Sequence, residues 1–255
     1  MFKSPRRWPA VLGTIALLGL TACATPAPRA ADPRDPFEPL NRAMHTFNED
    51  LDRALVRPVA RGYSKIMPQP LQDGVSNVFF NARYPVTMTN NALQGKWRAA
   101  WSDLGRIMLN TTVGLGGLFD PATAAGLDRN DEDFGQTLGK WGVPAGPYIV
   151  MPFLGPYTLR DGIGSIVDDF AEPRSYLKSD RTRYGLWAAD KFDRRVRLLD
   201  ADAILERTGD SYAFIRSAYL QRREYLTRDG EVGADDLEAE LEAIFDEEDE
   251  SPPEL

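Results

Sequence analysis

Few side chains in this sequence are of the types that carry out catalysis or bind metal ions. The 255 residues include one cysteine, Cys23, and one histidine, His45. A Ser-His-Asp triad would have to use His45, but no Gly-x-Ser-x-Gly segment supplies a nucleophile elbow. A zinc site built from His and Cys would need more such ligands. The composition therefore predicts no enzyme, no catalytic residue, no metal and no cofactor, and His45 is expected to be a helix-surface or packed residue.

Cys23 is the residue whose surroundings indicate a covalent modification. It follows Leu20-Thr21-Ala22, which follow a basic start and an apolar run over residues 11–20. This order is typical of a secretory signal peptide, and the run is too short for a membrane span, which takes about twenty residues. Leu-Thr-Ala-Cys resembles the bacterial lipobox, so Cys23 is predicted to be a lipid anchor. The alternative is an ordinary signal peptide with an incidental Cys.

The residues after Cys23 predict a lipid-anchored domain on a tether. Ala24 rather than Asp follows the anchor, which by resemblance to the enterobacterial sorting rule favours the outer membrane, in its periplasm-facing leaflet. Residues 23–36 are rich in Pro and Ala and are predicted to be a flexible tether. With residues 1–22 removed as the signal peptide, the predicted helical domain spans residues 37–228.

The net charge of −8 is concentrated at the C-terminus. Residues 231–255 contain twelve acidic and no basic residues. Like charges in a run repel one another and cannot bury a core, so residues 229–255 are predicted to be an acidic, disordered tail. The alternative is an interaction tail for a basic partner. No basic stripe elsewhere suggests nucleic acid as a partner.

Apolar residues recur at helical spacing through most of the chain. A first helix, which Pro58 is expected to break or kink near its end, is predicted by the stripe of Leu40, Met44, Phe47, Leu51, Leu55 and Val59. Further helices are predicted over residues 70–80, 96–112, 184–207 and 211–228. Capping residues predict two more, one after Asp120 and one from Thr158 to about Phe170. No strand pattern of convincing length is present, so the fold class is predicted to be mainly α.

Two segments do not fit a regular helix. Residues 113–119 are apolar but include three glycines, each of which destabilises a helix by up to about 1 kcal/mol relative to alanine. A hinge that approaches lipid and a tight packing turn explain this segment equally well. Residues 141–157 contain four Pro and three Gly between large apolar residues. This second segment must wrap a core or contact a membrane.

Several motifs resemble one known family in their order and spacing. They include Asn41-Arg42-Ala43-Met44, Val56-Arg57-Pro58-Val59-Ala60, Met67-Pro68-Gln69-Pro70, the run 109–120 with its glycines, the run 133–144, and Thr158-Leu159-Arg160-Asp161. Together they resemble the VacJ/MlaA family of outer-membrane phospholipid-transport lipoproteins, over about residues 35–226. Two departures are visible. The first helix is about one residue short after Asn48, and the acidic tail is longer than the family's pattern suggests.

The resemblance implies a helical ring-like single domain embedded in one membrane leaflet, with irregular Gly/Pro-rich apolar segments. Such a protein would remove mislocalised phospholipids from the outer leaflet through an amphipathic channel. It would pass them to a soluble periplasmic lipid carrier of the MlaC type and so maintain outer-membrane lipid asymmetry. A trimeric porin is the implied membrane partner. The alternative is an envelope scaffold lipoprotein with no transport role.

Two sets of residues are the candidates for contact with lipid. The predicted channel or hinge consists of Gly114, Leu115, Gly116, Gly117, Leu118 and Phe119. The predicted membrane girdle consists of Trp141, Tyr148, Ile149, Met151, Phe153 and Leu154.

Overall fold

The structure is a computed structural model that describes residues 32–231. The predictions for the signal peptide and Cys23, most of the tether and most of the acidic tail lie outside the described residues. The chain divides into two units, Met1–Pro33 and Arg34–Leu255. Everything below concerns the second unit.

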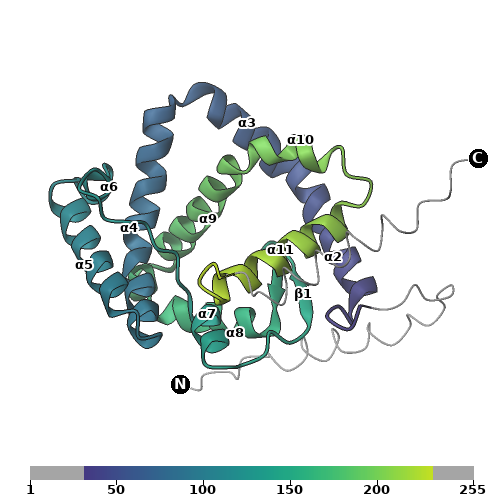
Figure 1. Ribbon diagram of the computed structural model, residues 1–255. Coiled ribbons are helices and arrows are strands. Elements are labelled where there is room, and N and C mark those ends of the chain that lie inside the picture. Colours follow the sequence, from purple (N-terminus) through teal and green to yellow (C-terminus); the bar gives the residue numbers. More distant parts are fainter. Residues whose placement is uncertain (1–31, 232–255) are drawn as a thin grey trace, which may run out of the picture. The chain divides into compact units, whose positions relative to one another are not determined.

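The first half of this unit is a succession of long helices (Figure 1). Helix α2 (Glu38–Leu51) continues through a π-helical turn, η1 (Asp52–Val56), into α3 (Arg57–Ile66). Helices α4 (Gln69–Leu93) and α5 (Trp97–Thr112) pack against each other, and the short α6 (Pro121–Ala124) packs on α5.

The second half begins with α7 (Phe134–Lys140) and a small antiparallel hairpin. Strands β1 (Tyr148–Met151) and β2 (Gly155–Thr158) pair with Tyr148 opposite Thr158. The elements that follow are α8 (Leu159–Ala171), the 3-10 turn η2 (Pro173–Tyr176), α9 (Asp180–Arg197), the 3-10 turn η3 (Leu199–Ala201), α10 (Asp202–Leu205) and α11 (Ser211–Thr227).

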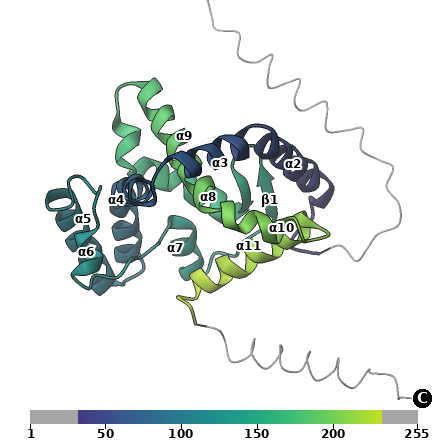
Figure 2. The same ribbon diagram turned by 90° about the horizontal axis from the view of Figure 1, so that it is seen from above.

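Contacts between distant elements connect the two halves. Helix α9 packs on both α3 and α4, α7 and α8 pack on α4, and α2 packs on β1. Within the second half, α11 packs on α7 and β2. Figures 1 and 2 show α9 and α11 lying beside the N-terminal helices. The predicted mainly α class is confirmed. The hairpin was missed because its two strands have four residues each, too few for a period-2 pattern to stand out among Pro and Gly.

Two prolines lie within helical stretches, and only for one of them, Pro58, does the sequence predict a break or kink. Pro58 neither breaks nor ends the first helical stretch, because α3 continues to Ile66. In the π-helical turn just before it, the Arg57 N–H donates to the Asp52 carbonyl five residues back, and this wider turn accommodates a residue that has no N–H of its own. Likewise α4 extends past Phe80 to Leu93 with Pro85 inside it.

The predicted helix over residues 184–207 ends early, at Arg197. Arg195 explains the turn that follows. Its guanidinium donates to Asp52 Oδ1 at 2.6 Å and to Asp202 Oδ1 at 2.8 Å, and the 3-10 turn brings Asp202 back within reach. The two predicted helix caps are confirmed, because Asp120 accepts from the Thr123 N–H and Thr158 accepts from the Asp161 N–H.

Both predicted boundaries of the domain move outward. Asp35, assigned to the tether, is buried and accepts hydrogen bonds from Asn41 Nδ2 at 2.8 Å and Arg216 Nη1 at 2.7 Å. Asp229, assigned to the tail, forms ion pairs with Lys96 and with Lys140 at 2.7 Å. In each case the carboxylate bonds to cations or amides on segments that are distant in sequence. Local composition therefore does not indicate that these residues belong to the domain.

The hydrophobic core is small. Its buried residues are Tyr148, Val150 and Tyr212, and Met44, Tyr219 and Leu220 pack against them. Across residues 32–231, no helix combines the length and the apolar character needed to cross a membrane.

Candidate functional site: a polar interior behind an apolar surface

Helix α5 has its apolar and polar faces reversed relative to an ordinary soluble helix. Trp97, Trp101 and Met108, which recur at helical spacing with Leu104 and form one apolar stripe, are 63%, 69% and 62% exposed. The buried positions of the same helix are Ala100, Asp103, Arg106 and Asn110. Within residues 32–231, eighteen buried side chains are polar or charged and nine are hydrophobic. The interior is therefore mainly polar, and the large apolar side chains lie outside.

Arg106 is the hydrogen-bonding centre of the α4–α5 region. Its Nε donates to the Tyr84 hydroxyl at 2.7 Å, its Nη2 donates to both Asp120 oxygens at 2.8 and 2.9 Å, and its Nη1 donates to a backbone carbonyl. Burial alone would raise the pKa of Asp120, but hydrogen bonds from Thr123 and Arg129 hold that pKa far below its ordinary value. The charges of Arg106 and Asp120 thus compensate each other inside the protein.

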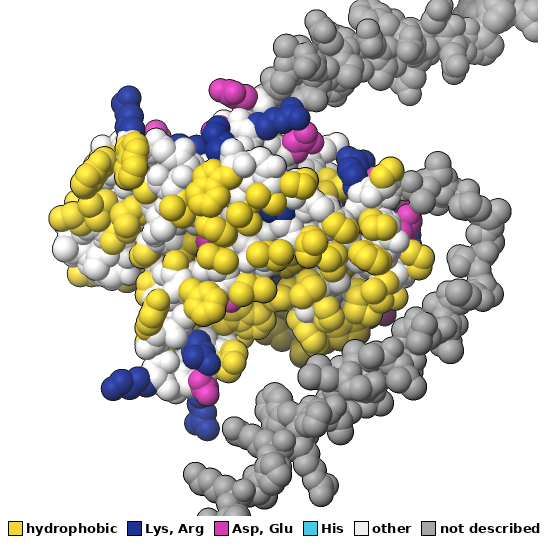
Figure 3. Space-filling view, turned by 90° about the horizontal axis from the view of Figure 1, so that it is seen from below, with side chains coloured by type: hydrophobic (Ala, Val, Ile, Leu, Met, Phe, Trp, Pro, Cys, Tyr) yellow, Lys and Arg dark blue, Asp and Glu magenta, His cyan; other side chains and the backbone are white. Residues whose placement is uncertain are grey.

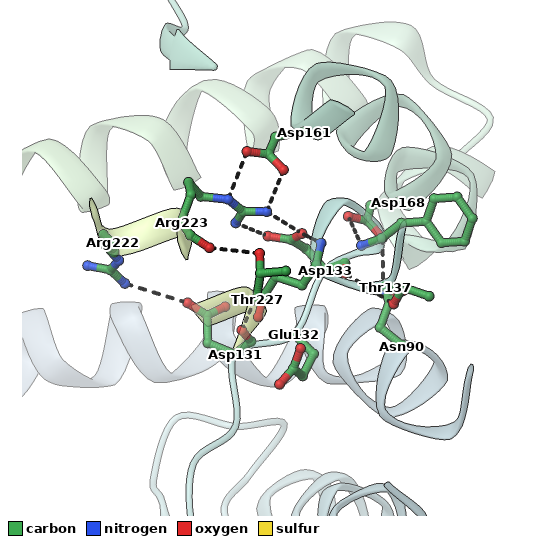
Figure 4. A network of polar contacts seen from close by, with 12 residues as sticks. Asn90, Asp131, Glu132, Asp133, Thr137, Asp161, Asp168, Arg222, Arg223 and Thr227 are labelled. Atoms are coloured by element: carbon green, nitrogen blue, oxygen red, sulfur yellow. Dashed lines mark hydrogen bonds and ion pairs between the residues drawn. The ribbon is translucent and has the colours of Figure 1, made fainter. Parts of the chain in front are cut away.

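A second polar network joins α4, α7, α8 and α11 (Figure 4). Arg223 lies between two carboxylates: it donates to Asp133 at 2.6 and 2.9 Å and to Asp161 at 2.9 and 2.8 Å. The Tyr219 hydroxyl adds a hydrogen bond to Asp161 at 3.0 Å. Two acids share one guanidinium, so α11 is fixed to the start of α7 and the start of α8 by charge-assisted hydrogen bonds.

Asp168 is the acid of this network whose hydrogen-bond partners are neutral. It accepts from Asn90 Nδ2 at 3.0 Å and from the Phe134 N–H at 3.0 and 3.2 Å. Asn90 in turn accepts from the Thr137 hydroxyl at 2.8 Å. Burial raises the pKa of Asp168 to about 6, although both hydrogen bonds favour the charged form. A buried carboxylate therefore titrates close to neutral pH.

Further charged side chains interact electrostatically with this network and with one another. They are Arg83 of α4, Glu172 after α8, and Lys191 and Arg194 of α9, and Tyr157 of β2 interacts with Arg83 and Arg194. Burial, followed by the neighbouring Arg194, lowers the pKa of Lys191. All five are half-buried, but Arg83 Nε is fully buried and has no hydrogen-bond partner among the described residues. Charged groups from both halves of the unit therefore gather beside the network.

The predicted channel or hinge, residues 113–119, forms a hydrogen-bonded turn after α5. Gly114 and Gly117 are closely packed, because a Cβ on them would lie 2.4 Å from the Asn110 carbonyl and 2.5 Å from the Asn81 Cβ. Gly116 has φ +74° but open space around it. Leu115 and Phe119 are exposed, and Leu118 packs on Gly74 of α4. This segment contributes no residue to the Arg223 network (Figure 4).

The predicted girdle is largely on the surface, with one correction. Trp141, Met151, Phe153 and Leu154 are exposed, and Ile149 is half-buried. Tyr148 is 1% exposed, and its ring lies edge-on to those of Tyr212 and Tyr219. Alternation along β1 turns Tyr148 and Val150 inward and Met151 outward, so Tyr148 belongs to the core.

Two asparagines on α2 hold the hairpin in place, a role that we did not predict from the sequence. The Val150 N–H donates to Asn41 Oδ1 at 2.9 Å, and Asn41 Nδ2 donates to the Tyr148 carbonyl at 3.0 Å. Seven residues further along the helix, Asn48 Nδ2 donates to the Met151 carbonyl at 3.0 Å. The side chains of α2 thus replace a neighbouring strand at the edge of β1. Asn41 and Asn48 are seven residues apart, which places both amides on one helix face. This spacing is the feature of the sequence from which the role could have been predicted.

His45 lies beside a hydroxyl and a carboxylate without forming a catalytic relay. Its Nε2 is 3.0 Å from Ser211 Oγ and 3.8 Å from Glu49 Oε2. A triad needs the serine and the acid on opposite ring nitrogens, whereas both groups here approach the same nitrogen. His45 lies on α2 and packs against α11, in agreement with the prediction of a packed or helix-surface residue.

The fold and its interior define a class: a mainly helical protein with large apolar side chains at its surface and charged groups inside. The chain belongs to the MlaA lipoprotein family, whose sequence model matches residues 33–226. This match confirms the family to which the sequence motifs pointed.

Individual relatives agree with this membership. The intermembrane phospholipid transport system lipoprotein MlaA of Escherichia coli strain K12 is 38% identical over 225 residues, which cover 87% of this chain and 88% of the relative. The Haemophilus influenzae protein of the same name is 31% identical over 229 residues, 86% and 90% of the two chains. A solved structure reported under "Structural basis for maintenance of bacterial outer membrane lipid asymmetry" has 37% identity and a TM-score of 0.69, and the match covers 76% of this chain and 98% of that one.

Proposed function

We propose that this protein is an outer-membrane lipoprotein that removes mislocalised phospholipids from the outer leaflet. The lipids pass through an amphipathic channel to a soluble periplasmic carrier, and outer-membrane lipid asymmetry is thereby maintained. Acyl chains on Cys23 hold the protein in the periplasm-facing leaflet. The names of its relatives, which refer to intermembrane phospholipid transport, support this proposal.

The observation that carries the proposal is the reversed distribution of side chains. Hydrophobic side chains cover much of the face seen in Figure 3, and most of the Lys, Arg, Asp and Glu visible there gather at its borders. Exposed residues such as Trp101 and Met108, 69% and 62% accessible, would be costly in water at about 25 cal/mol per Å² of apolar surface. Hydrocarbon around this face removes that cost. No helix of residues 32–231 is suited to cross a bilayer, which fits a protein embedded in one leaflet.

The half-buried charges of the interior supply the polar side of the proposed channel. Arg83 and Lys191 come from α4 and α9 and offer cations to a phosphate group. The exposed turn containing Gly116 and Phe119 remains the proposed hinge. The proposed membrane girdle consists of Trp141, Ile149, Met151, Phe153 and Leu154, with Tyr148 removed from it.

The proposed partners follow from the same scheme. A trimeric porin surrounds the protein within the membrane, and a soluble lipid carrier of the MlaC type receives the phospholipid in the periplasm. Crosslinking from exposed positions of the girdle, such as Phe153 (66% exposed), should recover the porin. Crosslinking from Arg53, which is 60% exposed on the polar surface, serves as the matched control and should not.

The test of transport is the amount of phospholipid on the surface of cells that lack the gene. We expect the native chain to restore a low level, and expect Cys23→Ala and Arg83→Glu to fail although both are produced. Arg53→Glu should restore it, because it makes the same charge change at an exposed position. If deletion leaves surface phospholipid unchanged, the proposal fails and an envelope scaffold without a transport role takes its place.

A further inference from the structure

The corner between α8 and α9 carries an exposed aromatic groove that the transport scheme does not use. We call it the aromatic corner. Figure 2 shows the α8–α9 connection projecting from the other helices. A groove of about 550 Å³ lies there, and its apolar lining consists of Ile166, Phe170, Tyr176, Tyr184 and Trp187. Tyr176 and Phe170 are 77% and 71% exposed. This volume is within the range of sites for small organic ligands.

Hydrogen bonds hold the shape of the aromatic corner. The Tyr176 hydroxyl donates to the Phe170 carbonyl at 2.7 Å, which fixes the 3-10 turn η2 against the end of α8. Arg174 Nη2 donates to Asp169 Oδ1 at 2.9 Å, and Arg174 also pairs with Glu172. The Tyr176 ring and the turn that connects it to Phe170 are therefore held in position without a ligand, which lowers the entropic cost of binding one.

Two cations, Arg174 and Arg183, and one acid, Asp169, also line the groove, and Arg183 is the weakly held cation. Arg183 lies 5.1 Å from the centre of the Tyr184 ring and donates to Asp180 at 2.8 Å. Asp180 is 77% exposed, so this ion pair contributes little and can be exchanged for another anion. Lys178 and Arg181, in the same connection and the first turn of α9, are also exposed. Together with Arg174 and Arg183 they make four cations against the three acids Asp169, Glu172 and Asp180, so the corner carries a small excess of positive charge that suits an anion whose apolar part occupies the groove.

We propose that the aromatic corner binds an anionic phospholipid of the membrane surface, with its phosphate on Arg183 and an acyl chain along Phe170 and Tyr184. This inference rests on the proposed function only in assuming that the protein meets a bilayer. Tyr and Trp beside Arg are typical of residues at the level of lipid head groups. Lys and Arg near a membrane surface attract anionic lipids and so favour them over zwitterionic lipids. The corner would fix the depth and tilt of the protein in its leaflet.

Trp187 provides a reporter inside the groove. The full-length lipoprotein would be produced with Trp97, Trp101 and Trp141 replaced by Phe and reconstituted into vesicles of equal parts phosphatidylglycerol and phosphatidylcholine. One lipid or the other carries brominated acyl chains, which quench nearby tryptophan. We expect brominated phosphatidylglycerol to quench Trp187 at least twofold more than brominated phosphatidylcholine. R181Q/R183Q should make the two equal.

A matched control removes the same number of charges elsewhere. R53Q/R222Q alters side chains that are 60% and 70% exposed, and it should leave the preference intact. Equal quenching by both lipids in the parent protein overturns the proposal, and so does the absence of quenching, which would mean that protein covers the corner. Surface phospholipid is measured separately in cells. A preference for phosphatidylglycerol without transport refutes the proposed function alone, and transport without the preference refutes this inference alone.

Discussion

The α4–α5 region and the α2–hairpin–α11 region solve the same packing problem in opposite ways. Between α2, β1 and α11, aromatic rings meet inside, where Tyr148 and Tyr212 are 1% and 3% exposed. Between α4 and α5, hydrogen bonds occupy the inside: Asn91 Nδ2 donates to Asp103 at 2.7 Å, and Arg106 reaches Asp120. The apolar side chains of α5 lie on its outer face.

This difference shows which part of the fold depends on its surroundings. A region with an apolar core is stabilised by the hydrophobic effect, because folding removes its apolar side chains from water. A region with a polar core and an apolar surface leaves its apolar side chains in contact with water. It is stabilised when hydrocarbon surrounds that surface. We therefore expect the hairpin region to be the intrinsically stable part, and the α4–α5 region to be the part adapted to lipid.

The largest effect should come from truncating an aromatic residue in the hairpin region. Tyr148→Ala removes a ring from the only apolar core cluster found within residues 32–231 and should lower the free energy of unfolding by about 4 kcal/mol. Trp101→Ala, at a 69% exposed position of α5, should change it by less than about 0.5 kcal/mol. Chemical unfolding in a mild detergent measures both. Equal losses would abolish the distinction between the two regions.

The next effect tests whether the polar core of the other region is a true core. Arg106→Met removes the buried one of the two guanidinium partners of Asp120 and the donor to the Tyr84 hydroxyl, and should cost about 3 kcal/mol because buried polar groups lose their compensation. Met fills a similar apolar volume, so the loss reports charge and hydrogen bonding rather than a cavity. A loss below about 1 kcal/mol in the same unfolding assay would show that solvent or Arg129 replaces Arg106.

The glycines after α5 sharpen the comparison at the edge of the polar region. Gly117→Ala places a Cβ 2.5 Å from the Asn81 Cβ at φ +94° and should cost about 2 kcal/mol. Gly116→Ala meets open space at φ +74° and should cost about 1 kcal/mol from backbone strain alone. Unfolding midpoints of the two variants test this, and that of Gly117→Ala should be the lower one. If transport falls equally with both while stability falls only with Gly117→Ala, the segment acts as a hinge as well as a packing turn.

The smallest effect is a pH dependence that arises between the two regions, at Asp168. Its pKa is about 6 in the folded protein and 3.8 without the fold. The stability contributed by its protonation is fully present below pH 3.8 and is lost as the pH rises through 6. The native protein should thus gain about 1 kcal/mol between pH 7 and pH 5 relative to Asp168→Asn. Parallel unfolding free energies for the two proteins across this interval would contradict the assignment.

Helical periodicity predicted the class of the fold and most of its helices because the repeat of 3.6 residues does not depend on which face is buried. The same pattern could not tell which face points outward. On α5 the stripe of Trp97 and Trp101 is real, but it faces away from the protein. Only the identity of the opposite face, with Asp103, Arg106 and Asn110 in register, hints that the polar side is the inner one.

The candidate site was less predictable than the fold because its parts come from distant segments. Arg223 meets Asp133 and Asp161 across ninety and sixty-two residues, and nothing local to any of the three indicates a partner. Tyr148 was misplaced for a related reason: inward or outward placement on a four-residue strand depends on the register set by Asn41. Caps such as Asp120 were predictable because both partners lie within three residues.

The contacts of Asp35 have a mechanical consequence under the proposed anchoring at Cys23. The Asp35 carboxylate accepts hydrogen bonds from Asn41, Tyr212 and Arg216. The carbonyl of the preceding residue, Arg34, accepts a hydrogen bond from the Tyr148 N–H at 2.8 Å. Tension applied through the N-terminal segment is therefore delivered at once to α2, β1 and α11, where several bonds must break together. A helix without these contacts would unwind one turn at a time under the same force. Here the force acts as shear on the hydrogen bonds of the hairpin region, and several of them bear it together.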